Sequence, residues 1–401
     1  MPVSPPRTRL RAALLFAVLL ASSGGDEVAV FALTFHLAPS GAYFVGTLQI
    51  AGLLPGVLLG RPVGRALVGR RPGPVLALAS AAQAAITVVL SSGLPPGGTV
   101  AGVALLAAVN TVSVTALNAA LPVLAGTDVA EKAYGLAQSA GSLAMVLGPL
   151  AGSALFATLG IRGALLADAA TFLTVTAYGV AVRTVELIPD DTESDSASER
   201  GGLTGGSLLA LGLVFVVIAA TAGTDVAFVF LVREHAPGSA VTVFGFATAA
   251  WAVGILAGSA LAGRLASTPP VARLALSGSV IGTVYLVCGL APTATVLLTT
   301  FVIGGIANAV FNTTLRAAIY RMTGPAQSAR AFGAFTAGVN AAVLCGILVT
   351  TPFAEDASAP AYAVGGAAAL CAALATVPIA LRTRAADPGR PRLRRPDTRA
   401  R

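Results

Sequence analysis

The sequence contains very little charge. Only 10% of its 401 residues are Asp, Glu, Lys or Arg, whereas 56% are hydrophobic; soluble domains typically contain about 25% charged and about 45–50% apolar residues. Together with a mean hydropathy of +0.84, this excludes a single soluble globular domain and a disordered chain, because neither could keep so much apolar surface from water. A spanning helix needs about 20 apolar residues, so the remaining class is a polytopic membrane protein with about a dozen spans.

Residue types that build metal sites and enzyme active sites are also scarce. The chain has two histidines and three cysteines, and Cys288, Cys345 and Cys371 lie in apolar stretches without a Cys-x-x-Cys spacing. This excludes a disulfide framework and a structural metal site. The sequence also lacks the ATP-binding loop G-x4-G-K-[ST] and the motifs G-x-S-x-G and H-E-x-x-H. We therefore expect no enzyme activity, no metal and no other cofactor.

What the sequence has in abundance is long apolar runs rich in Ala, Leu, Val and Gly. Their length and continuity favour helices over the short alternating strands of a β-barrel, and helices satisfy their own backbone groups in hydrocarbon. The twelve runs are 12–37, 42–66, 72–91, 99–125, 133–159, 161–182, 207–232, 240–263, 270–290, 294–320, 329–352 and 359–381.

The basic residues predict the topology. If the N-terminus is cytoplasmic, all of the 25 Lys and Arg residues except Arg162 and Arg233 fall in cytoplasmic segments, as the positive-inside rule requires. The sequence therefore predicts a multi-pass protein of the cell membrane with both termini in the cytoplasm. Topology also accounts for the net charge of +8, so we expect no nucleic-acid partner.

The chain divides into two halves. Segment 183–206 is rich in acidic, Ser, Thr and Gly residues and is predicted to be a cytoplasmic linker. A shift of 199 residues aligns Asp26 with Asp225 and His36 with His235, the only two histidines. The predicted fold is therefore an all-α membrane protein whose twelve transmembrane helices form two pseudo-symmetric six-helix bundles, arranged as parallel repeats. The predicted units are a bundle over 1–182, the linker 183–206, a bundle over 207–381 and a basic cytoplasmic tail over 382–401.

Twelve runs in two parallel halves with a charged central loop resemble the major facilitator superfamily. The stretch Ser22-Ser23-Gly24-Gly25-Asp26 resembles the start of its macrolide-efflux and enterobactin-exporter branch, as does Leu165–Phe172 in the sixth run. The fifth run resembles the antiporter motif G-x8-G-x3-G-P-x2-G-G of drug–proton exchangers. Its matching residues are Gly135, Ala144, Gly148, Pro149, Gly152 and Ser153. The resemblance implies the major facilitator fold and the export of drug-like molecules in exchange for protons.

Two positions depart from that family's pattern. The superfamily's loop after the second span usually reads G-x-x-x-D-R-x-G-R-R, and Gly64 stands here in the place of the aspartate, before Arg65. The resemblance then implies that gating relies on other contacts. The candidate gating residues of this loop are Gly60, Gly64, Arg65, Arg70 and Arg71. An arginine common in the fourth span of drug antiporters is also absent, since Leu117 and Asn118 stand near its place.

Acidic residues inside apolar runs are the strongest candidates for a functional site. Asp26, Glu27, Asp168 and Asp225 lie well inside such runs. A carboxylate at that depth costs about 2.5–3.5 kcal/mol, so each acid should face a wet cavity or be protonated. We predict that they are proton-coupling acids, with Asp26 the main one. The alternative is that each acid packs between helices and hydrogen-bonds a neighbouring Ser, Thr or Asn.

Uncharged residues add two further predictions. Asn110 and Asn308 correspond in the repeat and either line the cavity or form hydrogen bonds across helices. The glycines at every fourth position from Gly52 to Gly64 predict a smooth face for close helix contact. We expect the cavity to be lined by the first, fourth, seventh and tenth spans, with the fifth span at the seam between the halves.

The sequence thus predicts a monomeric secondary active transporter in the lipid bilayer. It is expected to export a hydrophobic or amphipathic small molecule, such as a drug, an antibiotic or a siderophore, in exchange for protons that enter the cell. It would thus act in multidrug resistance. One alternative is an importer or facilitator of another solute. Another alternative is a membrane receptor or scaffold of the same fold that transports nothing.

Overall fold

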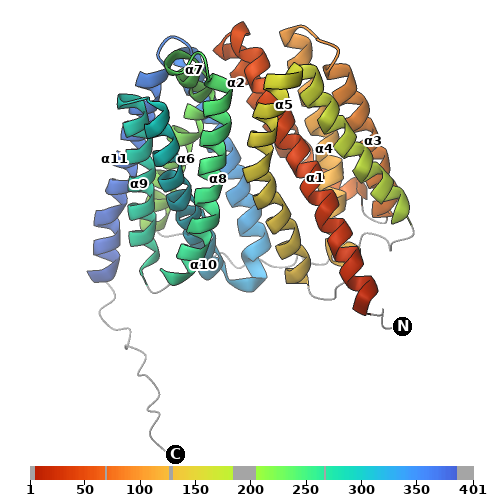
Figure 1. Ribbon diagram of the computed structural model, residues 1–401. Coiled ribbons are helices and arrows are strands. Elements are labelled where there is room, and N and C mark those ends of the chain that lie inside the picture. Colours follow the sequence, from red (N-terminus) through yellow and green to blue (C-terminus); the bar gives the residue numbers. More distant parts are fainter. Residues whose placement is uncertain (1–4, 68–69, 126–129, 184–204, 266–267, 386–401) are drawn as a thin grey trace, which may run out of the picture.

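The computed structural model describes residues 5–67, 70–125, 130–183, 205–265 and 268–385, and over these ranges every regular element is a helix (Figure 1). The elements of the first half are α1 (Pro5–Leu37), η1 (Ala38–Ser40), α2 (Ala42–Leu67), α3 (Pro72–Leu90), α4 (Pro96–Ala125) and α5 (Ala130–Ala181). Those of the second half are α6 (Gly205–Ala222), α7 (Thr224–His235), α8 (Ala240–Arg264), α9 (Pro270–Leu290), α10 (Ala294–Thr350), η3 (Thr351–Phe353) and α11 (Ser358–Ala385).

Two of these helices each cross the fold twice. Helix α5 has 52 residues and α10 has 57, more than twice the about 20 residues that one span needs. In α5 the turn is at Gly160, whose φ of 66° lies in the left-handed region that glycine adopts without strain. Conversely, α6 and α7 together make the single span Leu211–His235.

The number of spans agrees with the prediction from sequence. Ten stretches of the described residues are long and apolar enough to cross a membrane, and one of them, Ser139–Ala181, contains both legs of α5. The shorter apolar segment Gly338–Phe353 forms the second leg of α10. The all-helical, twelve-span architecture of a multi-pass membrane protein is therefore confirmed.

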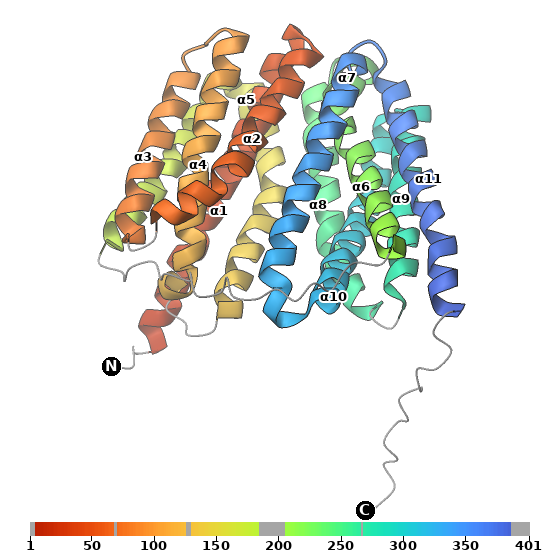
Figure 2. The same ribbon diagram turned by 180° about the vertical axis from the view of Figure 1, so that it is seen from behind.

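The helices gather into two bundles, α1–α5 and α6–α11 (Figures 1 and 2). Within the first bundle α2 packs on α4, and α3 packs on α4 and α5; within the second, α8 packs on α10, and α9 packs on α10 and α11. These pairs correspond under the internal repeat. Helix α1 begins and α11 ends on the same side of the molecule (Figures 1 and 2), which we call the terminus side; the opposite side is called the far side.

Only parts of the predicted linker and tail fall within the described residues. Helix α11 extends to Ala385, so residues 382–385 of the predicted tail are helical. Residues 386–401 of that tail, and residues 184–204 of the predicted linker, lie outside the described ranges.

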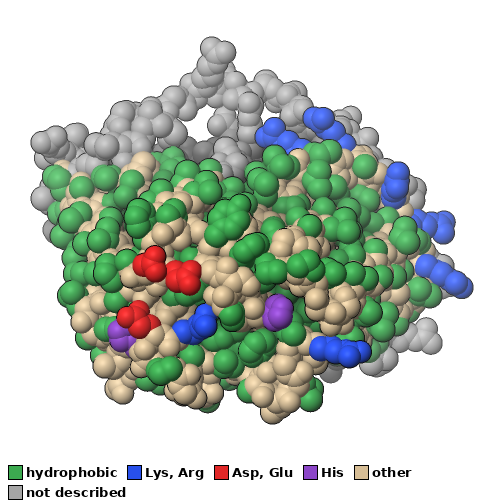
Figure 3. Space-filling view, turned by 90° about the horizontal axis from the view of Figure 1, so that it is seen from above, with side chains coloured by type: hydrophobic (Ala, Val, Ile, Leu, Met, Phe, Trp, Pro, Cys, Tyr) green, Lys and Arg blue, Asp and Glu red, His purple; other side chains and the backbone are tan. Residues whose placement is uncertain are grey.

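The two halves meet tightly on the far side. The Ala42 backbone N–H donates a hydrogen bond of 3.2 Å to the Glu355 carboxylate, and Gly46 contacts Thr351. Below these contacts the ring of Phe35 on α1 packs against Phe244 on α8 at 5.1 Å between centroids. Figure 3 views this face and shows a continuous surface on which hydrophobic and uncharged side chains predominate.

A second buried cluster lies toward the terminus side. The buried cluster there contains residues of α1–α5 alone among those described: Leu15, Leu19, Leu67, Leu76, Ala116, Leu121 and Ala140. Among the described residues, nothing packs closely against the glycine face predicted on α2. A Cβ atom at Gly52, Gly60 or Gly64 would meet nothing within 4 Å, and one at Gly56 would meet only Thr111 at 4.0 Å.

Glycine instead mediates the crossing of α8 and α10. A Cβ atom at Gly305 would lie 3.0 Å from the Gly254 Cα atom and 3.0 Å from the Ile255 backbone nitrogen. The backbones of α8 and α10 can therefore approach closely here only because Gly254 and Gly305 have no side chains.

We predict that Gly305→Leu destabilises the second bundle, because the new side chain must push two backbones apart. Overpacking of this kind typically costs about 1–3 kcal/mol. The measurement is thermal unfolding in detergent, followed by loss of the monodisperse peak in size-exclusion chromatography. Gly212→Leu is the matched control, since a Cβ atom there meets nothing within 4 Å; equal melting temperatures for the two variants would contradict the close crossing.

Candidate functional site

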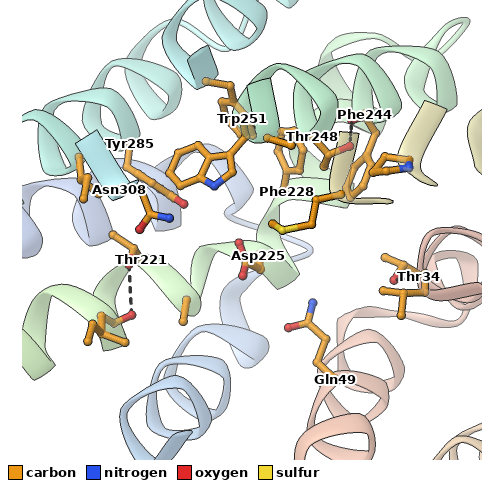
Figure 4. Close-up of a pocket in the computed structure, with 18 of the residues that line it drawn as sticks. Thr34, Gln49, Thr221, Asp225, Phe228, Phe244, Thr248, Trp251, Tyr285 and Asn308 are labelled. Atoms are coloured by element: carbon orange, nitrogen blue, oxygen red, sulfur yellow. Dashed lines mark hydrogen bonds between the residues drawn. The ribbon is translucent and has the colours of Figure 1, made fainter. Parts of the chain in front are cut away.

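A cavity of about 530 Å³ lies between the two halves (Figure 4). It is lined by α1, α2 and α5 from the first half and by α6–α11 from the second. The expected contributions of the first, seventh and tenth spans are present. Helix α4, which was expected to line the cavity, contributes no residue among those described, whereas α8 contributes four, α9 two and α2 one.

One wall of the cavity is aromatic. Phe228 packs between Phe244 and Phe301 with centroid distances of 4.6 and 4.8 Å. Trp251 packs edge-on against Phe301 at 5.6 Å, and Tyr285 is 6.0 Å from Trp251. All five rings belong to the second half (Figure 4). The wall therefore offers a broad, rigid, apolar surface with few polar atoms.

Two of the four predicted acids reach this cavity. Asp225 lies near the start of α7, is exposed, and points into the space that Gln49 enters from α2 (Figure 4). Glu27 on α1 also lines the cavity. Neither carboxylate has a hydrogen bond or an ion pair with another described residue. The cavity thus contains two acids, one from each half.

The other two acids lie elsewhere. Asp26 is absent from the cavity lining and interacts electrostatically with Asp168 of α5. Asp168 is 0% exposed; one of its carboxylate oxygens lies 3.5 Å from the Thr171 hydroxyl, and the other has no hydrogen-bond partner. Gly25 makes room for this group, because a Cβ atom there would lie 2.6 Å from Asp168 Oδ1. Asp26 and Asp168 therefore form a second acidic pair inside the first bundle.

The adjacent residues Asp26 and Glu27 of α1 thus lie at two different sites. Successive helical residues point about 100° apart, so Glu27 lines the cavity whereas Asp26 does not and interacts electrostatically with Asp168. Any rotation or tilt of α1 moves both carboxyl groups together.

The two repeat-related asparagines have different environments. Asn110 on α4 accepts a hydrogen bond of 3.2 Å from Gln83 Nε2 on α3 and so bonds across helices. Asn308 lines the cavity, where its side-chain oxygen accepts a bond of 2.9 Å from Asn312 Nδ2. Of the two alternatives predicted for this pair, Asn110 therefore forms a hydrogen bond across helices and Asn308 lines the cavity.

The residues of the antiporter-like motif place the first leg of α5 between α1 and α8. A Cβ atom at Gly148 would collide with Glu27, and one at Gly152 would lie 3.1 Å from the Phe31 Cβ atom. On its other side α5 approaches the second half, because a Cβ atom at Gly245 of α8 would lie 3.0 Å from the Pro149 carbonyl oxygen and 2.7 Å from the Ser153 Cβ atom. Ala144 is buried, and Gly135 lies on α5 where only the backbone is described.

The predicted gating residues lie away from the cavity. Gly60, Gly64 and Arg65 are on the last turns of α2, and Arg70 and Arg71 follow the end of that helix with exposed side chains. None of the five lines the cavity among the described residues.

Sequence reasoning missed Gln49 and the aromatic wall. A usable signal existed for two of these residues: Trp251 is the only tryptophan of the chain, and Gln49 is a lone amide in an apolar run. The three phenylalanines and the tyrosine of the wall are spread over four helices, and no spacing in the sequence connects them.

Known proteins share this architecture at low sequence identity. No protein-family model and no curated protein matches the sequence. Among solved structures, a mutant of the nucleoside transporter NupG superposes with a TM-score of 0.72 at 14% identity, covering 93% of this chain and 99% of that chain. A POT family transporter in complex with 5-aminolevulinic acid gives 0.74 at 10% identity, covering 92% and 96%.

A third structure is a bacterial homologue of the human lysosomal transporter Spinster in an inward-facing, unoccupied conformation. It gives a TM-score of 0.61 at 15% identity and covers 96% of each chain. All three superpositions extend over both bundles. The chain has the major facilitator fold. In this fold the cavity lies at the interface of the repeated halves, as it does here.

We predict that Gly148→Leu and Gly152→Leu abolish the efflux expected from the sequence while the protein still inserts into the membrane. A large side chain at either position separates α5 from α1 and displaces Glu27 or Phe31. Efflux from proteoliposomes and the yield of purified protein are the two measurements.

Gly141→Leu on the same helix is the matched control, because a Cβ atom there meets nothing within 4 Å. It should retain most of the activity. Full activity in Gly148→Leu would mean that the close contact with α1 is not required.

Proposed function

We propose that the protein is a proton-coupled exporter of the major facilitator superfamily, close in function to its macrolide-efflux and enterobactin-exporter branch. Its substrate is a hydrophobic or amphipathic small molecule, and it works as a monomer in the cell membrane by alternating access. The observation that carries this proposal is the cavity between the halves, which contains an acid from each half and is closed on the far side.

The distribution of contacts supports alternating access. In the proposed topology both termini are cytoplasmic, so the far side faces outward and this conformation is closed to the outside. The glycine face of α2 is unpacked here. A smooth helical face of this kind suits close contact with the second half in the opposite state, when the cavity closes toward the cytoplasm.

The acidic pair Asp26–Asp168 supports proton coupling. Two carboxylates that interact in hydrocarbon, with no basic residue bonded to either among those described, cannot both ionise cheaply. A proton shared by the pair would relieve this repulsion, and we assign the coupling proton to this pair. Because Glu27 adjoins Asp26 on α1, a substrate that moves α1 at the cavity also changes the surroundings of the pair. The proton gradient is then the energy source, and no cofactor is required.

The similar structures include a nucleoside transporter, a POT family transporter in complex with 5-aminolevulinic acid and the human organic anion transporter MFSD10. The fold alone is thus compatible with import or facilitated diffusion as well as export. The aromatic wall favours an amphipathic molecule over a sugar-like one, since it places an apolar surface beside polar groups such as Gln49, Asp225 and Asn308.

We predict that Asp26→Asn blocks proton-driven efflux while sparing substrate binding and exchange. Asp168→Asn should also reduce pumping, because it removes the second carboxyl of the pair, whereas Asp225→Asn should leave the response to the gradient in place. The measurement is efflux of radiolabelled erythromycin, an amphipathic macrolide, from proteoliposomes under an imposed pH gradient. A loss of at least about tenfold is expected for Asp26→Asn, equivalent to about 1.4 kcal/mol.

The control is Asp356→Asn, which alters an exposed acid on the far side. If Asp26→Asn pumps like the unmodified protein, and if the gradient has no effect on either, the coupling proposal fails and facilitated diffusion becomes the better account.

A further inference from the structure

The structure assigns a charge to the substrate: we infer that the cavity binds organic cations with a bulky apolar or aromatic body and rejects anions of the same shape. This inference depends on the proposed function only in treating the cavity as the transport site. Its core is a binding preference, which can be tested without any gradient.

The first observation is the sign of the charges in the cavity. Glu27 and Asp225 line it, and no Lys, Arg or His is among the lining residues that the structure describes. The nearby amides of Gln49, Asn308 and Asn312 carry no net charge. An anion entering this space would lose its hydration and gain no counter-charge, whereas a cation would meet one carboxyl group from each half.

The second observation is the aromatic wall, which is independent of the acids. The faces of Trp, Tyr and Phe rings attract cations, and Trp does so most strongly. Trp251, Tyr285 and Phe228 all line the same cavity as Asp225 (Figure 4). A cation with apolar substituents can therefore place its charge near Asp225 and its body against the rings.

The third observation is size. A volume of about 530 Å³ lies within the range of about 300–1,000 Å³ that holds drug-sized ligands. The space is far larger than a metal ion or ammonium requires, and no group of residues that could hold a metal is found among those described. The expected ligand is consequently a large organic cation rather than an inorganic one.

The chain contains its own reporter for this test. Trp251 is the only tryptophan and lines the cavity, so intrinsic tryptophan fluorescence reports binding there directly. The probes are tetraphenylphosphonium and tetraphenylborate, which have nearly the same shape and opposite charge. We expect saturable quenching with tetraphenylphosphonium and at least tenfold weaker binding of tetraphenylborate.

The variants separate charge from fold. Asp225→Asn should weaken tetraphenylphosphonium binding at least fivefold, and Glu27→Gln should weaken it in the same direction. Asp225→Glu keeps the charge and should restore binding to within about twofold. Asp356→Asn should have no effect. Equal affinity for the two probes, or unchanged affinity in both Asp225→Asn and Glu27→Gln, would overturn the inference.

Failure of the cation preference can be distinguished from failure of the proposed proton-coupled export. Selective binding of the cation without gradient-driven efflux would uphold the cationic site and remove the proton-coupled exporter. Gradient-driven efflux of erythromycin together with equal binding of the two tetraphenyl ions would uphold the exporter and remove the charge preference.

Discussion

The cost of placing a carboxyl group in hydrocarbon is the constraint on which the site depends. An acid at this depth must have water, a proton or a partner, and the four intramembrane acids of the chain meet that requirement in two different ways. Glu27 and Asp225 face the cavity, while Asp26 and Asp168 lie together inside the first bundle. The protein thus separates acids that can meet a substrate from acids that are shielded from it, although two of them are neighbours on α1.

Close packing at glycines occurs both at the cavity and at the Asp26–Asp168 pair. Gly25 leaves room for Asp168, and Gly148 leaves room for Glu27. Both glycines therefore fix how α1 sits against the two legs of α5, and α5 also contacts α8 at Gly245. In the proposed cycle, a movement between the halves would reach the helix that carries both Asp26 and Glu27 through α5. In the proposed exporter, this chain of contacts would couple substrate binding to proton transfer without a direct contact between the two.

Much of the architecture could be predicted from the sequence, because each span has enough apolar residues to be recognised alone and the repeat of Asp26 and His36 at Asp225 and His235 relates the halves. The site was harder to predict. That Asp26 and Glu27 lie in the membrane follows from the chain, but which of them faces the cavity depends on where α5 lies. Asn110 shows the same limit: its partner Gln83 is on α3, and nothing local indicates that this pair closes the α3–α4 contact. The aromatic wall requires several helices to be assembled before its residues meet.

Alternating access requires the far-side closure to open during each cycle. The direct test replaces Gly46 and Thr351 by cysteine in a background in which Cys288, Cys345 and Cys371 are serine. A Cβ atom at Gly46 would lie 3.1 Å from the Thr351 Cβ atom, close to the about 3.5–4.5 Å that a disulfide spans. Efflux of erythromycin from proteoliposomes is measured after oxidation and again after reduction, with Gly46→Cys alone as the control. If the far side must open, the cross-link stops efflux and reduction restores it. Undiminished efflux by fully cross-linked protein would contradict alternating access at this cavity.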